Sequence, residues 1–339
     1  MSSPEAAMPA PAIAQYVSAP GISISIIIPA LNEEKMIGRC LDSLTQLTLA
    51  RDRFEVLVVD NGSRDKTLDI ADSFRDRLNL RILQQSDVRI SALRNLGAHA
   101  ALGKILAFLD ADCLAPADWL DRILALASTN GAGVLGAHYL LPEDSSWVGR
   151  TWHRYQEAPK SGEISHVPAG DLVMRREDFF KLGGFDEAIQ TNEDYELCER
   201  ARKAGMHVRA FPQIAVVHLG TAQSLSVFFR KQAWHGTHVI KVFLRDIFRS
   251  HNRNAVFFAV YTLLSIFSVI VGAAWTFTWH GPRSLIVAGL AVLCLPPIAL
   301  STKHIRISRR YSDFFPLFVL YLTYGIARAK ALLNIKNFV

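Results

Sequence analysis

Two aspartates, Asp110 and Asp112, stand two positions apart directly after a short apolar run at residues 105–109. In an extended segment, side chains two apart point to the same side, so these carboxylates can act together. One can accept a hydrogen bond from a ribose hydroxyl, while the other meets a hard divalent cation that holds a diphosphate as its charge grows. Asp-Ala-Asp alone is weak support for such a site, because the same triplet occurs in ordinary turns.

The elements needed to position this pair follow from the apolar pattern of the N-terminal half. Runs typical of buried strands fall at residues 22–28, 54–59, 80–84 and 105–109. Apolar residues at helical spacing fall between them, at residues 35–49, 65–78 and 90–101. This alternation predicts an α/β fold, a mostly parallel sheet with helices on both faces. Ligands bind outside the carboxyl ends of such strands, where Pro29, Asp60 and Asp110 fall.

The pattern is less regular after residue 118. We expect helices at residues 119–127, 176–182 and 194–204. Short strands are expected within residues 131–141, 167–175, 207–211 and 215–218. The loops within residues 136–168 are those about which the sequence is least informative.

The C-terminal third contains a membrane signal. Residues 255–279 and 284–302 carry no charge, and each run is long enough to cross a hydrocarbon core about 30 Å thick. The short connector predicts a transmembrane hairpin, since two buried core helices would need a second large domain. Lys and Arg residues flank the hairpin on both sides, which places the large domain in the cytoplasm, at an inner or plasma membrane.

Two further segments lie beside this hairpin. Ser224 can cap a basic amphipathic helix of the kind that lies in a membrane surface, although a helix packed on the large domain fits its pattern equally well. The apolar stretch at residues 314–327 is short for a span, and a crossing would export Arg328, Lys330 and Lys336, so we expect an interfacial helix. The predicted units are a flexible tail at 1–21, an α/β domain at 22–223, a basic helix at 224–253, a hairpin at 254–302 and a basic segment at 303–339.

Composition narrows the function classes. A net charge of +6 suits nucleic acid, an anionic leaflet or phosphate-bearing substrates. Without zinc-finger spacing or a basic tract interleaved with aromatics in the N-terminal part, we expect no nucleic-acid partner. Cys40, Cys113, Cys198 and Cys294 form no Cys-x-x-Cys pair, which argues against a disulfide framework or a zinc site.

Six short motifs occur in a fixed order along residues 22–236. They are Pro29-Ala30-Leu31-Asn32-Glu33, Val58-Val59-Asp60-Asn61-Gly62-Ser63, Arg94-Asn95-Leu96-Gly97, Leu109-Asp110-Ala111-Asp112, Gly183-Gly184-Phe185-Asp186-Glu187 and Glu193-Asp194. In this order and spacing they resemble a family 2 glycosyltransferase, although each motif alone is weak. The resemblance implies the GT-A fold, a nucleotide-diphosphate sugar donor, Mg2+ or Mn2+ as the metal, and inversion at the anomeric carbon.

The resemblance also implies roles for individual residues. The donor-binding set is Pro29, Ala30, Asn32, Glu33, Asp60, Arg94 and Asp110. Asp112 is the expected metal ligand, with His218 near the metal or diphosphate. A single displacement needs a base to take the proton of the acceptor hydroxyl, a role assigned to Asp194 with Glu193 as the alternative. Acceptor or sugar contacts are assigned to Asp171, Gly184 and Phe185.

Two departures from the family pattern refine this reading. The Gln-x-x-Arg-Trp signature of processive polysaccharide synthases is absent, and the nearest residues are Gln232, Trp234 and His235. We therefore expect transfer of one sugar to a lipid-linked or membrane-proximal acceptor. Cys113 stands where many relatives carry another acid, which puts one metal contact in doubt.

Two other functions fit the sequence less well than a glycosyltransferase does. The first is a non-catalytic membrane assembly protein that keeps the fold, and the intact acidic set argues against it. The second is a soluble nucleotidyltransferase, which is disfavoured because no basic Gly-rich loop for a triphosphate follows the first strand.

Overall fold

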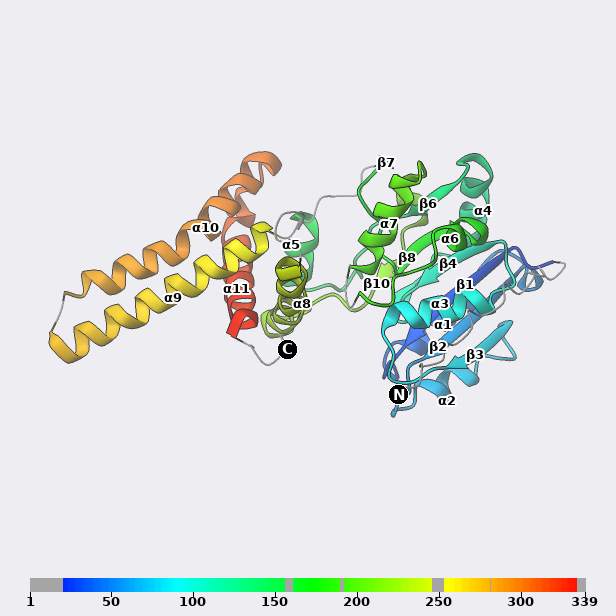
Figure 1. Ribbon diagram of the computed structural model, residues 1–339, viewed down its shortest axis with the longest axis horizontal. Helices are drawn as coiled ribbons and strands as arrows, with labels where there is room; N and C mark the ends of the chain where they lie inside the picture. Colours follow the sequence, from blue (N-terminus) through cyan, green and yellow to red (C-terminus); the bar gives the residue numbers. More distant parts are fainter. Residues whose placement is uncertain (1–20, 156–160, 190–191, 246–252, 281, 334–339) are drawn as a thin grey trace, which may run out of the picture.

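The computed structural model describes residues 21–155, 161–189, 192–245, 253–280 and 282–333. An α/β domain and a group of long helices lie at opposite ends of the molecule, with α5 (Trp147–Tyr155) and α8 (Leu225–Arg245) between them (Figure 1). Parts of three predicted segments lie outside the described residues. They are residues 1–20 of the tail, 246–252 of the basic helix and 334–339 of the basic C-terminal segment.

An eight-stranded mixed sheet forms the α/β domain, in the order β3-β2-β1-β4-β8-β6-β9-β7. The first four strands in this order are parallel, namely β1 (Ile24–Ala30), β2 (Phe54–Asp60), β3 (Leu80–Gln84) and β4 (Ile105–Leu109). The other four are β6 (Gly133–Gly136), β7 (Gly162–Glu163), β8 (Asp171–Arg175) and β9 (His207–Ala210). Because β8 runs antiparallel to both β4 and β6, it joins the two halves of the sheet.

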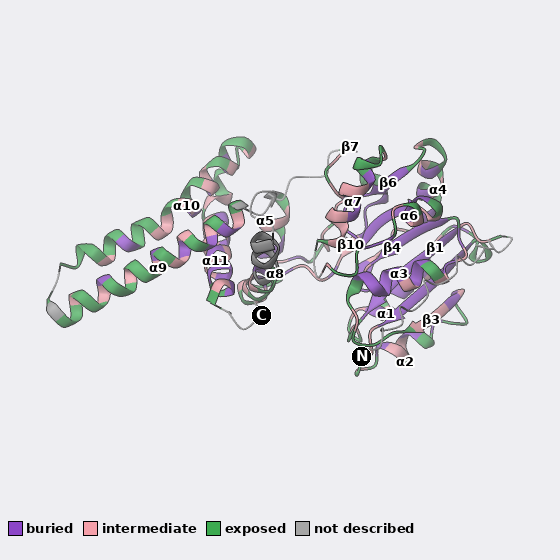
Figure 2. Cartoon of the chain, viewed as in Figure 1, coloured by how far each residue is buried: buried purple, intermediate pink, exposed green. Residues whose placement is uncertain are grey.

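Helices cover both faces of this sheet, because alternate strand residues bury opposite faces. One face packs against α1 (Ile37–Thr45), α2 (Thr67–Asp72) and α4 (Trp119–Thr129). The other packs against α3 (Ile90–Ala100), α6 (Arg176–Lys181) and α7 (Glu193–Lys203). Figure 2 shows the buried strands between these two layers. The predicted α/β architecture is confirmed.

Three segments differ from the expected boundaries. The helix predicted at residues 65–78 is α2, which ends at Asp72. The segment 131–141 contributes only β6, because later residues turn toward a separate ribbon in which β5 (Cys113–Leu114) pairs with β10 (Val217–His218). Residues 167–170 form a turn, closed by the Asp171 N–H donating to the Pro168 carbonyl over 3.0 Å, so β8 begins later than expected.

The predicted hairpin consists of α9 (Arg253–Trp279) and α10 (Ser284–Ser308), which lie side by side (Figure 1). Gly272 and Gly289 lie at their contact, where an added Cβ would meet Leu285 and Val269. Many large apolar side chains on this pair are exposed, among them Phe257, Phe267, Leu290 and Leu295 (Figure 2). An apolar surface of this extent is typical of lipid contact, and both helices are long and apolar enough to cross a membrane.

The last helix, α11 (Phe314–Leu333), is longer than the apolar stretch at residues 314–327 suggested. With the preceding 3-10 turn η3 (Tyr311–Asp313), it is a third segment long and apolar enough to cross a membrane. It packs on the hairpin through Gly325, beside Thr262 and Phe258, and on α8 through Ala331, beside Gly236. The length argument against a third crossing is therefore wrong, while the interfacial placement of residues 303–339 stays a prediction.

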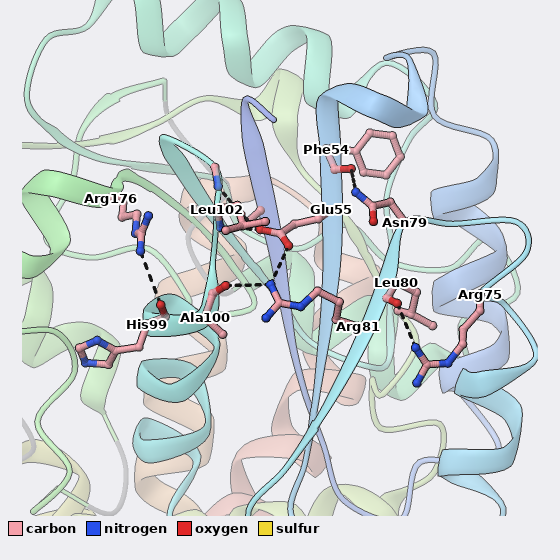
Figure 3. Close-up of polar contacts among 12 residues, drawn as sticks. Phe54, Glu55, Arg75, Asn79, Leu80, Arg81, His99, Ala100, Leu102 and Arg176 are labelled. Carbon is pink, nitrogen blue, oxygen red and sulfur yellow. Dashed lines mark hydrogen bonds and ion pairs between the residues drawn. The ribbon is translucent and has the colours of Figure 1, made fainter. Parts of the chain in front are cut away.

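A buried carboxylate fixes the edge of the sheet where β1 and β2 begin. Glu55 is fully buried and accepts hydrogen bonds from Ser25 Oγ at 2.6 Å, the Leu102 N–H at 2.5 Å and Arg81 Nη1 at 3.2 Å. Arg81 also donates to the carbonyl of Ala100 over 2.9 Å. Figure 3 shows how β2, β3 and the end of α3 meet around this one charge.

We expect Glu55→Gln to lower the free energy of unfolding by about 1–3 kcal/mol, because charge-assisted hydrogen bonds are lost inside the protein. The site lies at the other end of these strands, so the folded variant should keep its activity. Chemical denaturation measures the first effect. The exposed Asp76→Asn should stay within about 0.5 kcal/mol of wild type, and equal losses in both variants would contradict this account of Glu55.

Candidate active site

The carboxyl ends of three parallel strands bring the predicted donor-binding segments together. Ala30 at the end of β1 is directly opposite Asp60 at the end of β2, and the Asn61 N–H donates to the Ala30 carbonyl over 2.9 Å. β4 is the other neighbour of β1, and Asp110 follows it immediately. Parallel pairing thus places Pro29, Ala30, Asp60 and Asp110 at one edge of the sheet.

Asp60 is fully buried and organises the loop that follows β2. Its Oδ2 accepts hydrogen bonds from the N–H groups of Gly62 at 2.8 Å and Ser63 at 2.9 Å. Its Oδ1 is buried and has no hydrogen-bond partner within the described residues. A buried carboxylate oxygen of this kind is able to accept a proton donor from a ligand.

Asn32 ties the loop after β1 to the same region. It adopts a left-handed backbone with φ 56°, which asparagine tolerates better than most residues. Its N–H donates to Ser63 Oγ over 2.9 Å, and its Oδ1 accepts from the Arg64 N–H at 2.9 Å. Asn32 therefore shapes the nucleotide-side loops through its hydrogen bonds.

Glu33 is an acid of this edge whose ionisation is strongly altered. Burial, followed by the negative charges of Asp112 and Asp110, raises the pKa of Glu33 to about 7. Its backbone N–H is held by Thr67 Oγ1 at 2.7 Å, which fixes the loop in this position. Glu33 thus lies in the negative field of Asp112 and Asp110, and a bound cation would relieve this repulsion.

Asp110 is held by a buried arginine. Arg94 Nη2 donates to Asp110 Oδ1 over 2.8 Å, and Arg94 Nη1 donates to Glu193 Oε1 over 2.6 Å. Tyr139 adds a hydrogen bond from its hydroxyl to Asp110 Oδ2 over 3.1 Å. Arg94 is therefore engaged with two acids, and it fixes their positions beside the predicted ribose and base sites.

Asp112 meets His218 through the small ribbon. The β5–β10 pairing sets Cys113 opposite His218, and the Leu219 N–H donates to the Asp112 carbonyl over 2.8 Å. His218 Nε2 then lies 3.3 Å from Asp112 Oδ2. Burial raises the pKa of Asp112, while the neighbouring His218 opposes that rise.

These two side chains fit a divalent cation, since a carboxylate oxygen and an imidazole nitrogen converge and other positions stay open for a ligand's phosphate oxygens. The described residues contain no group of three His, Cys, Asp or Glu side chains placed to hold a metal by themselves. Cys113 adds no ligand, because it is buried and burial raises the pKa of its thiol.

The two candidate bases begin α7, on the other side of Arg94. Glu193 is paired with that arginine, whereas Asp194 Oδ2 accepts a hydrogen bond from the Ala169 N–H at 3.2 Å. Burial raises the pKa of Asp194 as well as that of Glu193. Of the two, Asp194 makes no ion pair among the described residues, which leaves it better able to take a proton.

The three predicted acceptor or sugar contacts are buried residues. Asp171 is fully buried on β8 opposite Leu109, and burial raises its pKa well above the ordinary value. Phe185 lies in the core against Phe108 at a ring distance of 5.1 Å, and Gly184 lies beside Asn95. Asp171, Phe185 and Gly184 are all buried in this structure, and their contact with a sugar or an acceptor stays a prediction.

Two residues of the site were missed in the sequence. Tyr139 contacts Asp110 and stacks on His218 with ring centroids 4.7 Å apart, but it lies in the stretch with no clear period. Asn95 binds the Phe185 backbone from both sides, accepting from its N–H and donating to its carbonyl, each at 2.9 Å. In the sequence, Asn95 could be noticed only because it follows Arg94 in a motif.

The fold has a solved counterpart. A mannosyltransferase from Pyrobaculum calidifontis, PcManGT, in complex with GDP-Man and Mn2+, superposes with a TM-score of 0.58 at 19% identity, covering 92% of this chain and 87% of that chain. This likeness confirms the predicted GT-A fold.

Sequence comparison makes the assignment more specific. Residues 25–183 match the family described as Glycosyl transferase family 2. Glycosyltransferase AglE of Haloferax volcanii is 30% identical over 229 residues, which cover 66% of this chain and 75% of that protein. The probable glycosyltransferase YdaM of Bacillus subtilis is 25% identical over 338 residues, covering 90% of this chain and 80% of that protein. The chain belongs to glycosyl transferase family 2, and it is a glycosyltransferase.

Gly170→Ala tests the placement of Asp110. An added Cβ would overlap the Asp110 carboxylate and lie 2.5 Å from the Tyr139 hydroxyl, so both groups must move. We expect at least a tenfold loss of kcat/KM, equivalent to about 1.4 kcal/mol, with far-ultraviolet circular dichroism unchanged. Gly131→Ala is the control for backbone strain: Gly131 adopts φ 62°, so alanine there should cost about 1–2 kcal/mol of stability, but its Cβ meets nothing within 4 Å, so kcat/KM should not change. Full activity of Gly170→Ala would contradict this placement.

Glu33→Gln tests the acidic cluster by its pH dependence. The folded-state pKa of about 7 exceeds the ordinary value of 4.5, so the metal-free wild type loses stability as pH rises between these values. With allowance for solvent screening, we expect the variant to be more stable than wild type by about 1 kcal/mol at pH 8. This difference should vanish below pH 4.5. Thermal unfolding with a chelator measures it, and Glu143→Gln, at an exposed acid, is the control. The same offset at both pH values would refute the assignment.

Proposed function

We propose that this protein transfers a sugar from a nucleotide-diphosphate donor to a lipid-linked or membrane-proximal hydroxyl, with inversion and with a divalent cation bound. The observation that carries this proposal is the meeting of Asp60, Asp110 and Asp112 at one sheet edge, with Asp194 across Arg94 from Asp110. A nucleotide-sugar donor accords with membership of the family. The acceptor and the metal are the parts of this proposal that go beyond family membership.

The nucleotide side of the donor suits the first two strand ends. Asp60 Oδ1 has no partner in the described part of the chain, so it is able to accept the ring N–H of uracil or guanine, a donor that cytosine lacks. The solved counterpart was described with GDP-Man and Mn2+, which supports a nucleotide-diphosphate sugar and a divalent metal. Asp110, fixed by Arg94, is suited to a ribose hydroxyl.

The metal is assigned to Asp112 and His218, as Mg2+ or Mn2+. When bound there, it would neutralise the diphosphate and so make it a better leaving group. Burial, and after it the charge of Asp110, raises the pKa of Asp112, and a bound cation would favour the ionised carboxylate there.

Asp194 is assigned as the base. It accepts the proton of the acceptor hydroxyl while that oxygen attacks the anomeric carbon from the face opposite the diphosphate. The bond from carbon to the diphosphate oxygen breaks at the same time, and its electron pair leaves with the diphosphate. Burial raises the pKa of Asp194, which strengthens it as a base. Glu193, paired with Arg94, instead holds that arginine in place.

The acceptor is assigned to the membrane surface. α9, α10 and α11 are each long and apolar enough to span a bilayer, and α5 and α8 connect this helical end to the α/β domain (Figure 1). The basic residues that flank the hairpin favour a cytoplasmic active site at an inner or plasma membrane. A hydroxyl carried by a lipid can then reach Asp194 without leaving the surface.

A donor screen with two variants tests the proposal. We expect one nucleotide-diphosphate sugar, with Mn2+ or Mg2+, to raise the melting temperature of the full chain in detergent. Asp112→Ala should lose the part of this rise that depends on the metal. Asp194→Asn should keep it while turnover falls by about 10²- to 10⁴-fold, the usual contribution of a general base.

The exposed Glu143→Gln serves as the control, with turnover measured on extracted lipids as acceptors. Absence of donor binding across the panel would refute the proposed function. Turnover by Asp194→Asn at the wild-type rate would refute the assignment of the base.

A further inference from the structure

Lys231 is a basic residue of α8 that reaches back to the active site. Its side chain is exposed, and its Nζ donates a hydrogen bond to the carbonyl of Gly220. Gly220 follows His218 in the short segment between β10 and α8. A cation on a helix outside the α/β domain is thereby held against the loop that carries the predicted metal ligand.

Gly220 itself packs directly against the acidic site. A Cβ at this position would overlap Asp112 Oδ2 and lie 3.0 Å from His218 Cε1, so the backbone touches the pair assigned to the metal. Any larger residue at position 220 would displace the side chains of Asp112 and His218. The carbonyl that Lys231 binds thus belongs to the residue that touches both Asp112 and His218.

The charge of Lys231 is available for a ligand. In the part of the chain that the structure describes, Lys231 makes no ion pair, and its hydrogen bond goes to an uncharged carbonyl. Its positive charge opposes the rise in pKa of both Glu33 and Asp112, so its field reaches the acidic cluster. Arg94, by contrast, is engaged with Asp110 and Glu193.

We propose that Lys231 binds the diphosphate of the donor and stabilises it as the leaving group, an inference that rests on the proposed function. Lys231 keeps its protons throughout. As the bond from the anomeric carbon breaks, the electron pair stays on the phosphate oxygen, and the ammonium group donates a hydrogen bond to that growing charge. The lysine stem turns from the Gly220 carbonyl to do so.

α8 connects the proposed diphosphate site to the apolar helices. α8 packs on α11, where Gln232 Oε1 accepts a hydrogen bond from the buried Arg328 at 3.0 Å and Gly236 lies beside Ala331. The residue next to Lys231 is thus fixed to the membrane-associated end. A complete diphosphate site then requires α8 docked in this position.

Binding of UDP, GDP and the matching monophosphates to the full chain in detergent tests the role of Lys231. For the diphosphate that wild type binds more tightly, we expect Lys231→Met to weaken binding roughly 10- to 100-fold, as for loss of a hydrogen bond to a charged group. Binding of the monophosphate should change by no more than about twofold. Lys231→Arg should restore most of the affinity.

Arg230→Met is the matched control, because it removes an exposed positive charge from the neighbouring position of the same helix. Equal affinities of Lys231→Met and Arg230→Met, or a Lys231→Arg variant as weak as Lys231→Met, would overturn the inference and leave the proposed function intact. Failure of wild type to bind either diphosphate would instead refute the proposed function, and this inference with it.

Discussion

The buried guanidinium of Arg94 is the interaction on which the site depends. Its side chain is only 3% exposed and bonds Asp110 at 2.8 Å and Glu193 at 2.6 Å, while Phe185 lies under it at 5.6 Å. Removing three charges from water is unfavourable, and such a group is tolerated only where the geometry is close to ideal. The arrangement therefore fixes the end of β4 and the start of α7 relative to each other, although they are far apart in the chain.

This constraint gives the motif at residues 183–187 a structural role. Gly184 approaches Asn95 so closely that a Cβ would lie 2.8 Å from its Oδ1, and Asn95 binds the Phe185 backbone on both sides. Phe185 then covers Arg94 and packs on Phe108 of β4. The motif thus supports the ion pair from below and excludes water from it, which strengthens the pairing.

How far sequence predicts structure differs between the two halves of the α/β domain. β2, β3 and β4 were predicted closely, because parallel strands buried on both faces appear as continuous apolar runs bounded by polar residues. The second half was harder, since β6, β8 and β9 interleave between sequence-distant partners. The burial of Asp171 depends on its register opposite Leu109, and no local pattern contains that information.

The same reasoning applies to the site. Strand-end acids were found because the carboxyl edge of a parallel sheet is a general ligand position. Tyr139 contacts Asp110 from an irregular segment, and Lys231 contacts the Gly220 carbonyl from α8, so both contacts depend on tertiary packing. Residues 29–34 and 60–65 interlock through Asn32 and Ser63, which spacing alone does not reveal. Motifs therefore indicate which side chains carry the chemistry, and packing decides which partners hold them.

The short connection between β10 and α8 joins the α/β domain to the helical end of the molecule. His218 belongs to the site, Ser224 Oγ accepts from the Val227 N–H at 3.3 Å as the cap of α8, and only residues 219–224 separate the two. Because this segment is short and the Leu219 N–H donates to the Asp112 carbonyl, the start of α8 is held close to the site. α8 in turn packs on α11, where Gly236 lies beside Ala331. The loop that touches the Asp112–His218 pair and the helix that packs on α11 therefore belong to one continuous stretch of chain.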